Sequence, residues 1–191
     1  MFEQDIKSRL TAIREPFTDN TRSLTALDFE LTRHAIHFDA KEKRQPFSMK
    51  HWNEAPMPQE FLFIVDDLAV RKLLLYAPHS FTLIRDSSLS PAVYYVYSIV
   101  DFLCIPKHRV RRPIRKTVPT FKGKWLIDFR NAASFDELPE AIDYIIKYPR
   151  KENTIFRDHI DCWGKYHSEH IGKGGTTRLE KHWKEDAKSH S

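Results

Sequence analysis

Two neighbouring segments of alternating apolar and polar residues constrain the fold of this chain more than any other feature. Residues 24–31 place apolar side chains at every second position at Leu27, Phe29 and Leu31, and residues 34–43 do so at Ile36, Phe38 and Ala40. Successive side chains of a strand point to opposite faces, so this pattern predicts two strands with one buried face. If Thr32-Arg33 forms a two-residue turn, the two strands make a β-hairpin.

The polar face of this predicted hairpin carries Asp28, Asp39 and Lys41. A two-residue turn puts Asp28 opposite His37 and makes Asp39 its diagonal neighbour, about 7–8 Å away by Cα. Glu30 lies on the same face. We therefore expect two carboxylates and one ammonium group to converge there.

Two close carboxylates repel each other unless a cation neutralises them. Mg²⁺ is held by one or two carboxylates together with water and phosphate oxygens, and Mn²⁺ is expected to serve as well. Such an ion polarises a phosphodiester and lowers the pKa of a bound water, while a neighbouring lysine orients that water or stabilises developing charge. The predicted face therefore has the parts that phosphodiester hydrolysis needs.

Asp28, followed eleven residues later by Asp39-Ala40-Lys41, resembles the PD-(D/E)XK nuclease superfamily. That superfamily includes restriction endonucleases, Holliday-junction resolvases and transposon-end nucleases. The chain has three Asp-x-Lys matches, but only this one lies on an alternating strand with an acid upstream. Leu27 stands where the family often has a proline.

The resemblance covers residues 1 to about 100 and implies a restriction-endonuclease-like core of helix, hairpin, helix and strand. It also implies metal ligation by Asp28 and Asp39, a catalytic role for Lys41 and a further acid from the first helix. Glu3 is the first choice for that acid, with Asp5 and Glu15 as rivals. Members commonly act as dimers, so the resemblance implies a homodimer acting on DNA.

The rest of the chain predicts further helices and strands. Apolar spacing and turn residues indicate these elements: a helix over 2–15, a helix over 66–76 with Asp66 as N-cap, strands over 80–85, 93–98 and 124–130, and a final helix that ends at Lys147 after a capping box at Ser134–Glu137. Residues 44–60 read as a loop, 61–65 as a strand or a helix lead-in, and 99–105 remain open. We expect an α/β fold with a mixed β-sheet flanked by helices over 1–149, followed by a polar C-terminal extension over 150–191.

Positive charge is concentrated in one segment. The net charge is +5, and residues 107–124 contain eight of the 31 Lys and Arg residues and no acid. Such a segment is attracted to phosphate backbones, so we expect nucleic-acid contacts from these residues and from the end of the hairpin: Lys43, Arg44, Lys107, Arg109, Arg111, Arg112, Arg115, Lys116, Lys122 and Lys124. A solvated loop between strands is the simpler alternative.

Composition excludes several classes of protein. No apolar run approaches 18 residues, so a membrane span is not expected. Glu3 and Asp5 at the start, without an apolar segment, argue against a signal peptide, and two cysteines give no disulfide framework, so the reduced cytoplasm is the default expectation. The few glycines form neither a dinucleotide-binding nor a P-loop motif.

Three functions follow from these patterns. The first is a Mg²⁺-dependent DNA endonuclease, and the second is a non-catalytic nucleic-acid-binding protein that uses the basic segment. The third is a zinc-assisted interaction protein, because four residues with zinc-ligating side chains lie close together in the extension: His159, Cys162, His167 and His170.

Overall fold

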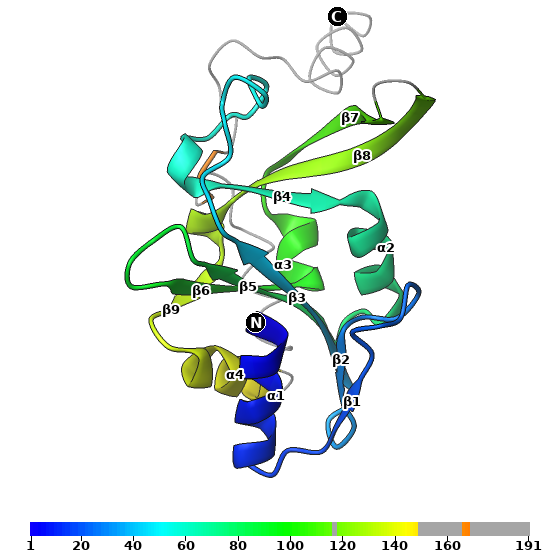
Figure 1. Ribbon diagram of the computed structural model, residues 1–191, viewed down its shortest axis with the longest axis vertical. Helices are drawn as coiled ribbons and strands as arrows, with labels where there is room; N and C mark the ends of the chain where they lie inside the picture. Colours follow the sequence, from blue (N-terminus) through cyan, green and yellow to red (C-terminus); the bar gives the residue numbers. More distant parts are fainter. Residues whose placement is uncertain (116–117, 149–165, 169–191) are drawn as a thin grey trace, which may run out of the picture.

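The described part of the chain forms two β-sheets, with two helices between them and two helices outside. The computed structural model describes residues 1–115, 118–148 and 166–168. In Figure 1, helices α1 (Phe2–Ala12) and α4 (Leu138–Lys147) lie below the larger sheet. Helices α2 (Asp67–Leu75) and α3 (Ile99–Cys104) lie above it, next to the smaller sheet.

The larger sheet has six strands and mixed direction. Strand β3 (Ile36–Lys43) is parallel to β5 (Ser80–Asp86), and helix α2 lies in the connection between them, while every other neighbouring pair is antiparallel. The other strands are β1 (Phe17–Asp19), β2 (Phe29–Leu31), β6 (Val93–Ser98) and β9 (Ala133–Phe135), and the order is β1-β2-β3-β5-β6-β9. The predicted α/β class with a mixed sheet flanked by helices is thus confirmed.

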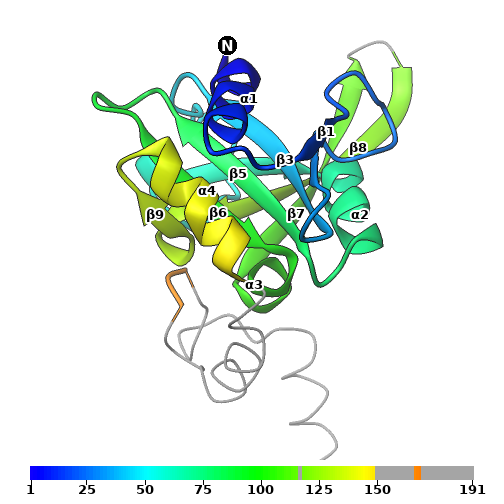
Figure 2. The same cartoon turned by 90° about the horizontal axis from the view of Figure 1, so that it is seen from below.

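Each face of this sheet has its own hydrophobic core. Phe38 and Ala40 of β3 point to α1 and α4, where they pack with Ile6 and Ile142, and Figure 2 shows both helices side by side on that face. On the other face, α2 and α3 pack between the sheets in a core that includes Ile84, Tyr97, Leu73, Phe63 and Phe129. Because side chains alternate along β3, residues 39, 41 and 43 point toward this second layer.

The smaller sheet has the order β4-β8-β7 and is antiparallel. Its strands are β4 (Leu62–Asp66), β7 (Lys107–Arg115) and β8 (Val118–Asp128), and short 3₁₀ turns at Gln59–Phe61 and Phe129–Asn131 adjoin it. The basic segment is therefore a long β-hairpin rather than a solvated loop. Of the two alternatives for residues 61–65 a strand is found, and residues 99–104 are helical, with a capping box formed by Ser98 and Asp101.

The strand predicted for 24–31 is much shorter than expected. Only Phe29–Leu31 pair as a strand, because the Ser23 hydroxyl accepts hydrogen bonds from the backbone amides of Thr25 and Ala26 and turns the chain there. Strand β1, which pairs with β2, was not expected, since Thr18-Asp19-Asn20 predicted only a turn.

The hairpin turn is also longer than predicted. It has four residues, Thr32 to Ala35, and Ala35 adopts a left-handed backbone with φ of 51°. The pairing is Leu31 with Ile36 and Phe29 with Phe38. This register places His37 opposite Glu30, and continued by one residue it brings Asp28 level with Asp39 instead of diagonal to it.

The two predicted caps also differ from the structure. Ser134 lies in β9, and α4 begins at Leu138 after Glu137, which makes no side-chain capping bond. Asp66 precedes α2 as expected, yet its carboxylate does not cap the helix, because it binds lysines of β8. In the described part of the chain, no helix is long and apolar enough to cross a membrane.

Candidate metal site

Asp28, Asp39 and Lys41 meet on the face of β3 that points to the second layer. The Lys41 Nζ lies 2.7 Å from Asp39 Oδ2 and 4.0 Å from Asp28 Oδ2. The Asp28 carboxylate is fixed from behind, since its Oδ2 accepts a hydrogen bond of 2.9 Å from the backbone amide of Ala40. The predicted convergence of two acids and one lysine is present, although the register that produces it differs from the expected one.

Burial makes Asp39 an unusual carboxyl group. Only 4% of the residue is exposed, and this desolvation raises the pKa of Asp39 to about 6. The Lys41 ammonium acts in the opposite direction, whereas the charge of Asp28 and a hydrogen bond between the two carboxyl groups raise the pKa further. Two carboxyl groups this close favour a shared proton or a cation between them.

A cleft of about 260 Å³ opens beside Lys41. Strand β4 forms one wall through residues 63–66, and α2 contributes Leu68, Ala69 and Lys72. Lys122 of β8 reaches the same cleft. The cleft thus reaches Lys41 from the space between the two sheets, three lysines line it, and Asp28 and Asp39 lie behind Lys41.

The residues present fit a hard divalent cation. The carboxylates of Asp28, just before β2, and of Asp39, on β3, supply the oxygen ligands that Mg²⁺ prefers, and the cleft beside Lys41 has room for water and a phosphate oxygen. Within residues 1–115, 118–148 and 166–168, no group of three His, Cys, Asp or Glu side chains comes together as a metal site. A metal held here would therefore take two protein ligands, Asp28 and Asp39.

The structure places Glu3 apart from this pair. Helix α1 packs on Ile36, Phe38 and Ala40, whose side chains point away from Asp39 and Lys41. The rivals are also engaged elsewhere: Asp5 binds Arg85, and the buried Glu15 pairs with Arg33 and His34. In the structure as described, no acid from the first helix is seen to join the two aspartates.

The expectation that Lys43 touches nucleic acid is wrong. Its side chain is 1% exposed and its Nζ lies 2.9 Å from Asp86 Oδ2, which is equally buried. The ammonium also donates to the Glu60 carbonyl and lies over the Phe129 ring. Strand alternation turns Lys43 into the second layer, where it closes the core beneath the end of β3.

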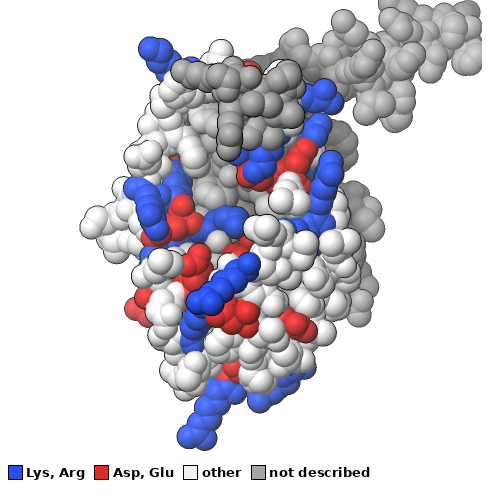
Figure 3. Space-filling view, turned by 45° about the vertical axis from the view of Figure 1, so that its right-hand side comes forward, with Lys and Arg blue, Asp and Glu red and all other residues white. Residues whose placement is uncertain are grey.

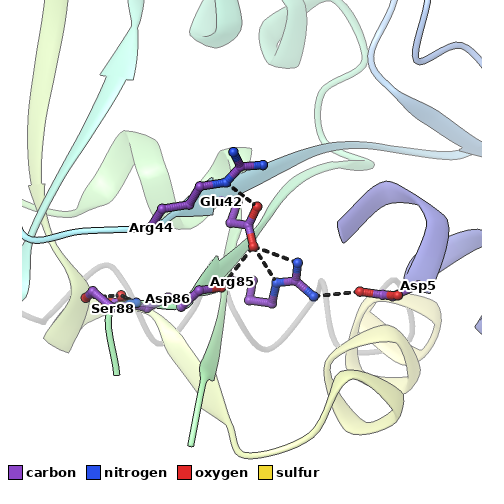
Figure 4. A network of polar contacts seen from close by, with 7 residues as sticks. Asp5, Glu42, Arg44, Arg85, Asp86 and Ser88 are labelled. Carbon is purple, nitrogen blue, oxygen red and sulfur yellow. Dashed lines mark hydrogen bonds and ion pairs between the residues drawn. The ribbon is translucent and has the colours of Figure 1, made fainter. Parts of the chain in front are cut away.

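Arg44 is exposed, and it lies at the end of a chain of ion pairs shown in Figure 4. Its Nε donates to Glu42, which also binds Arg85, and Arg85 reaches Asp5 of α1 at 2.6 Å. Burial is the largest single influence on Glu42 and opposes its ionisation, but the bonds from Arg44, Arg85 and Ser87 together outweigh it and lower the pKa of Glu42 to about 2. This network ties α1 to the sheet on the face opposite the candidate site.

Four cations of the β7–β8 hairpin pair with acids that are distant in the sequence. Lys122 and Lys124 both bind Asp66, and Arg109 binds Asp67. Arg112 binds Glu54 at 2.6 Å and lies over the Trp52 ring. Figure 3 accordingly shows Lys and Arg beside Asp and Glu on this face instead of a separate positive field.

The remaining basic residues differ in accessibility. Lys107 is half-buried and donates to the carbonyls of Leu103 and Ile105 at the end of α3, and burial lowers its pKa. Arg111 is exposed. The side chain of Arg115 and the whole of Lys116 lie outside the described part of the chain.

Two residues near the site were not anticipated from the sequence. Lys72 lies in the cleft and donates a hydrogen bond of 3.0 Å to the carbonyl of Ala26, two residues before Asp28. Asp66 lines the same cleft. The sequence placed both on or next to a helix, but their position beside Lys41 depends on the β3–α2–β5 connection, which no local pattern reveals.

Of the four proposed zinc ligands, His167 alone lies among the described residues. His167 donates its backbone amide to Asn131, and the neighbouring Ser168 hydroxyl binds the Asp128 carboxylate at 2.6 Å. His159, Cys162 and His170 lie outside the described residues. The zinc hypothesis and the nature of the extension therefore stay predictions.

Comparison with known proteins adds no assignment. No protein-family model matches the chain, and no curated protein or solved structure has significant similarity to it.

Proposed function

We propose that this protein is a Mg²⁺-dependent DNA endonuclease that hydrolyses phosphodiester bonds. Its active site would consist of Asp28, Asp39 and Lys41. The observation that carries the proposal is the approach of two carboxyl groups and one ammonium group, from β3 and the residue just before β2, with the ammonium group of Lys41 lining a cleft. A purely structural ion pair needs one acid and one base. A second acid, whose presence raises the pKa of a buried neighbour, is instead typical of a site that binds a cation.

The order of elements supports the same proposal. The resemblance to PD-(D/E)XK nucleases implies a helix, a hairpin, a second helix and a further strand. The chain provides α1, the β2–β3 hairpin, α2 and β5 in that order, with α1 and α2 on opposite faces of the sheet. Asp28 immediately precedes β2, and Asp39 and Lys41 lie within β3.

Each side chain of the site has its own proposed role in hydrolysis. Asp28 and Asp39 would hold the ion, which supplies Lewis-acid polarisation of the phosphate and a more acidic water. The amide of Ala40 keeps Asp28 in place. Once the carboxylates bind a metal, the Lys41 ammonium is free to donate hydrogen bonds to the attacking water or to a phosphate oxygen.

The test is cleavage of supercoiled plasmid DNA by the purified protein with Mg²⁺, with Mn²⁺ and with EDTA. We expect cleavage only with the metals, and a loss of about 100-fold or more in Asp39→Asn and in Lys41→Gln. Asp143→Asn is the matched control, because Asp143 is a partly exposed acid of α4, on the opposite face of the larger sheet. Cleavage in EDTA, or full activity in a folded Asp39→Asn, Lys41→Gln double variant, would contradict the proposal.

A non-catalytic nucleic-acid-binding protein is the second candidate. The β7–β8 hairpin is a two-stranded ribbon with Arg111 and Phe121 exposed, and β-ribbons of this kind enter DNA grooves. This function predicts salt-dependent DNA binding that Asp28→Asn and Asp39→Asn leave unchanged, without turnover in any metal. The homodimer and the cytoplasmic location remain predictions, and the first is tested by sedimentation.

A further inference from the structure

Two hollows connect the candidate metal site with the β7–β8 hairpin. The first is the cleft beside Lys41. The second, about 200 Å³, is lined by Asp67, Leu68, Arg71, Phe121, Lys122 and Gly123. Both include Leu68 and Lys122, so they adjoin at these two residues, and we refer to the pair as one groove between Lys41 and Phe121.

Phe121 is an exposed aromatic residue at the far end of this groove. It is 64% exposed and lies two residues before Gly123 on the same face of β8. Gly123 packs so closely against α2 that a Cβ there would clash with the Asp67 carboxylate. The hairpin and the helix are thus locked together at Gly123, and the Phe121 ring remains open beside that contact.

The groove has the charge that a phosphate backbone requires. Its two acids, Asp66 and Asp67, already bind Lys122, Lys124 and Arg109. The further cations Lys72 and Arg71 therefore leave the groove with a net positive charge.

We propose that this groove holds a single-stranded segment of DNA, with its phosphates along Lys72, Lys122 and Arg71 and one base stacked on Phe121. An exposed ring among cations is the usual platform for unpaired bases, whereas the bases of a duplex are already stacked and paired. The inference rests on the proposed nuclease function and names its substrate: DNA with an unpaired strand next to the bond that is cut.

The test measures binding of the full chain to fluorescent oligonucleotides in EDTA, where no cleavage occurs. We expect tighter binding to a single strand than to a duplex of the same sequence. Phe121→Leu keeps an apolar side chain without the ring and should weaken single-strand binding about tenfold, whereas Phe121→Trp should retain it. Arg71→Gln should weaken it as well.

Two exposed residues outside the groove give matched controls. Leu75→Ala removes an exposed apolar side chain of α2, and Lys147→Gln removes an exposed cation of α4, so both should bind like the unaltered protein. Equal binding of single strand and duplex, or unchanged binding by Phe121→Leu, would overturn the inference. Phe121-dependent binding without cleavage of any DNA would uphold the groove and contradict the nuclease. Cleavage of DNA that does not depend on Phe121 would support the nuclease and contradict the single-strand groove.

Discussion

A single buried carboxyl group, Asp39, links stability to pH. Its pKa rises from 3.8 to about 6 because burial disfavours the charged form. A raised carboxyl pKa means that the folded state holds its proton more tightly than the unfolded chain. Folding stability from this group is therefore complete below about pH 4 and is lost as the pH rises through 6.

Asp39→Asn should consequently stabilise the metal-free protein at neutral pH. We expect a gain of about 2 kcal/mol in the free energy of unfolding at pH 8, and little difference from the unaltered protein at pH 4. Urea unfolding in EDTA across this range provides the measurement. The control Asp143→Asn should give a difference that does not vary with pH in this way, and a pH-independent effect of Asp39→Asn would count against the burial argument.

The buried pair Lys43–Asp86 predicts a second residue-level effect. Lys43→Met leaves the Asp86 carboxylate buried without its ammonium partner, which should cost about 3 kcal/mol or more. Adding Asp86→Asn removes the uncompensated charge and should restore most of that loss. Thermal unfolding of the two variants decides this, with Lys147→Met as an exposed control. A double variant no more stable than Lys43→Met would show that the charge is not the cause.

The face of β3 to which each side chain points could be predicted from the sequence, but the residues that surround each side chain could not. Alternation correctly assigned Asp39 and Lys41 to one face and Phe38 and Ala40 to the other. The same alternation places Lys43 with Asp39, yet nothing local indicates that Asp86 lies beside it on β5. Burial of this charge depends on the second sheet, which is assembled from β4, β7 and β8, later segments of the chain.

At the scale of elements, the contact between β8 and α2 depends on the absence of a side chain at Gly123. Gly123→Ala places a methyl group where the Asp67 carboxylate now lies, so Asp67 must leave Arg109. We expect a loss of about 1–3 kcal/mol in the free energy of unfolding. The companion variant Asp67→Ala makes room for the methyl group.

In a double-mutant cycle, Gly123→Ala should therefore cost much less when Asp67→Ala is already present. The matched strand position Arg111, which faces Gly123 from β7, supplies Arg111→Ala as a control that leaves this contact intact. Additive effects of the two substitutions would mean that the methyl group acts elsewhere.

Strong periodic patterns predicted most helices and strands, but the residues at which these elements begin and end were predicted less accurately. Helix α1 and strand β6 lie within or match the expected ranges, and α4 ends where predicted. The errors arise where short polar side chains compete with the regular backbone, as at Ser23, or where a loop takes a left-handed residue, as at Ala35. That error in the turn moved the register, and yet Asp28 and Asp39 still meet, because both possible pairings keep them on the same face.

At the scale of the whole molecule, the charge balance should limit DNA affinity. Burial opposes ionisation of Asp66, but the hydrogen bonds from Lys122 and Lys124 outweigh it and lower the pKa of this carboxyl group. Asp66 therefore stays charged and competes with DNA phosphates for both lysines. Cations that were expected to act as one free patch are in this way partly neutralised.

Asp66→Asn should release the two lysines and strengthen binding to DNA. We expect a several-fold rise in affinity at low salt, and a steeper decline with salt by about one to two phosphate contacts. Fluorescence anisotropy over a range of salt concentrations tests this. Glu137→Gln, an exposed acid before α4, is the control. An unchanged salt slope would mean that Lys122 and Lys124 do not face the DNA.

Strand β3 is central to the larger sheet, with apolar residues against the outer helices and the acids and lysines against the inner layer. Insertion of a single residue just before Phe38 would exchange these two sets, turning Asp39 and Lys41 into the hydrophobic core under α1 and α4 and Phe38 toward the inner layer. The segment between β3 and β4 contains no strand, so an added residue there would leave the spacing between Asp28 and Asp39 unaltered.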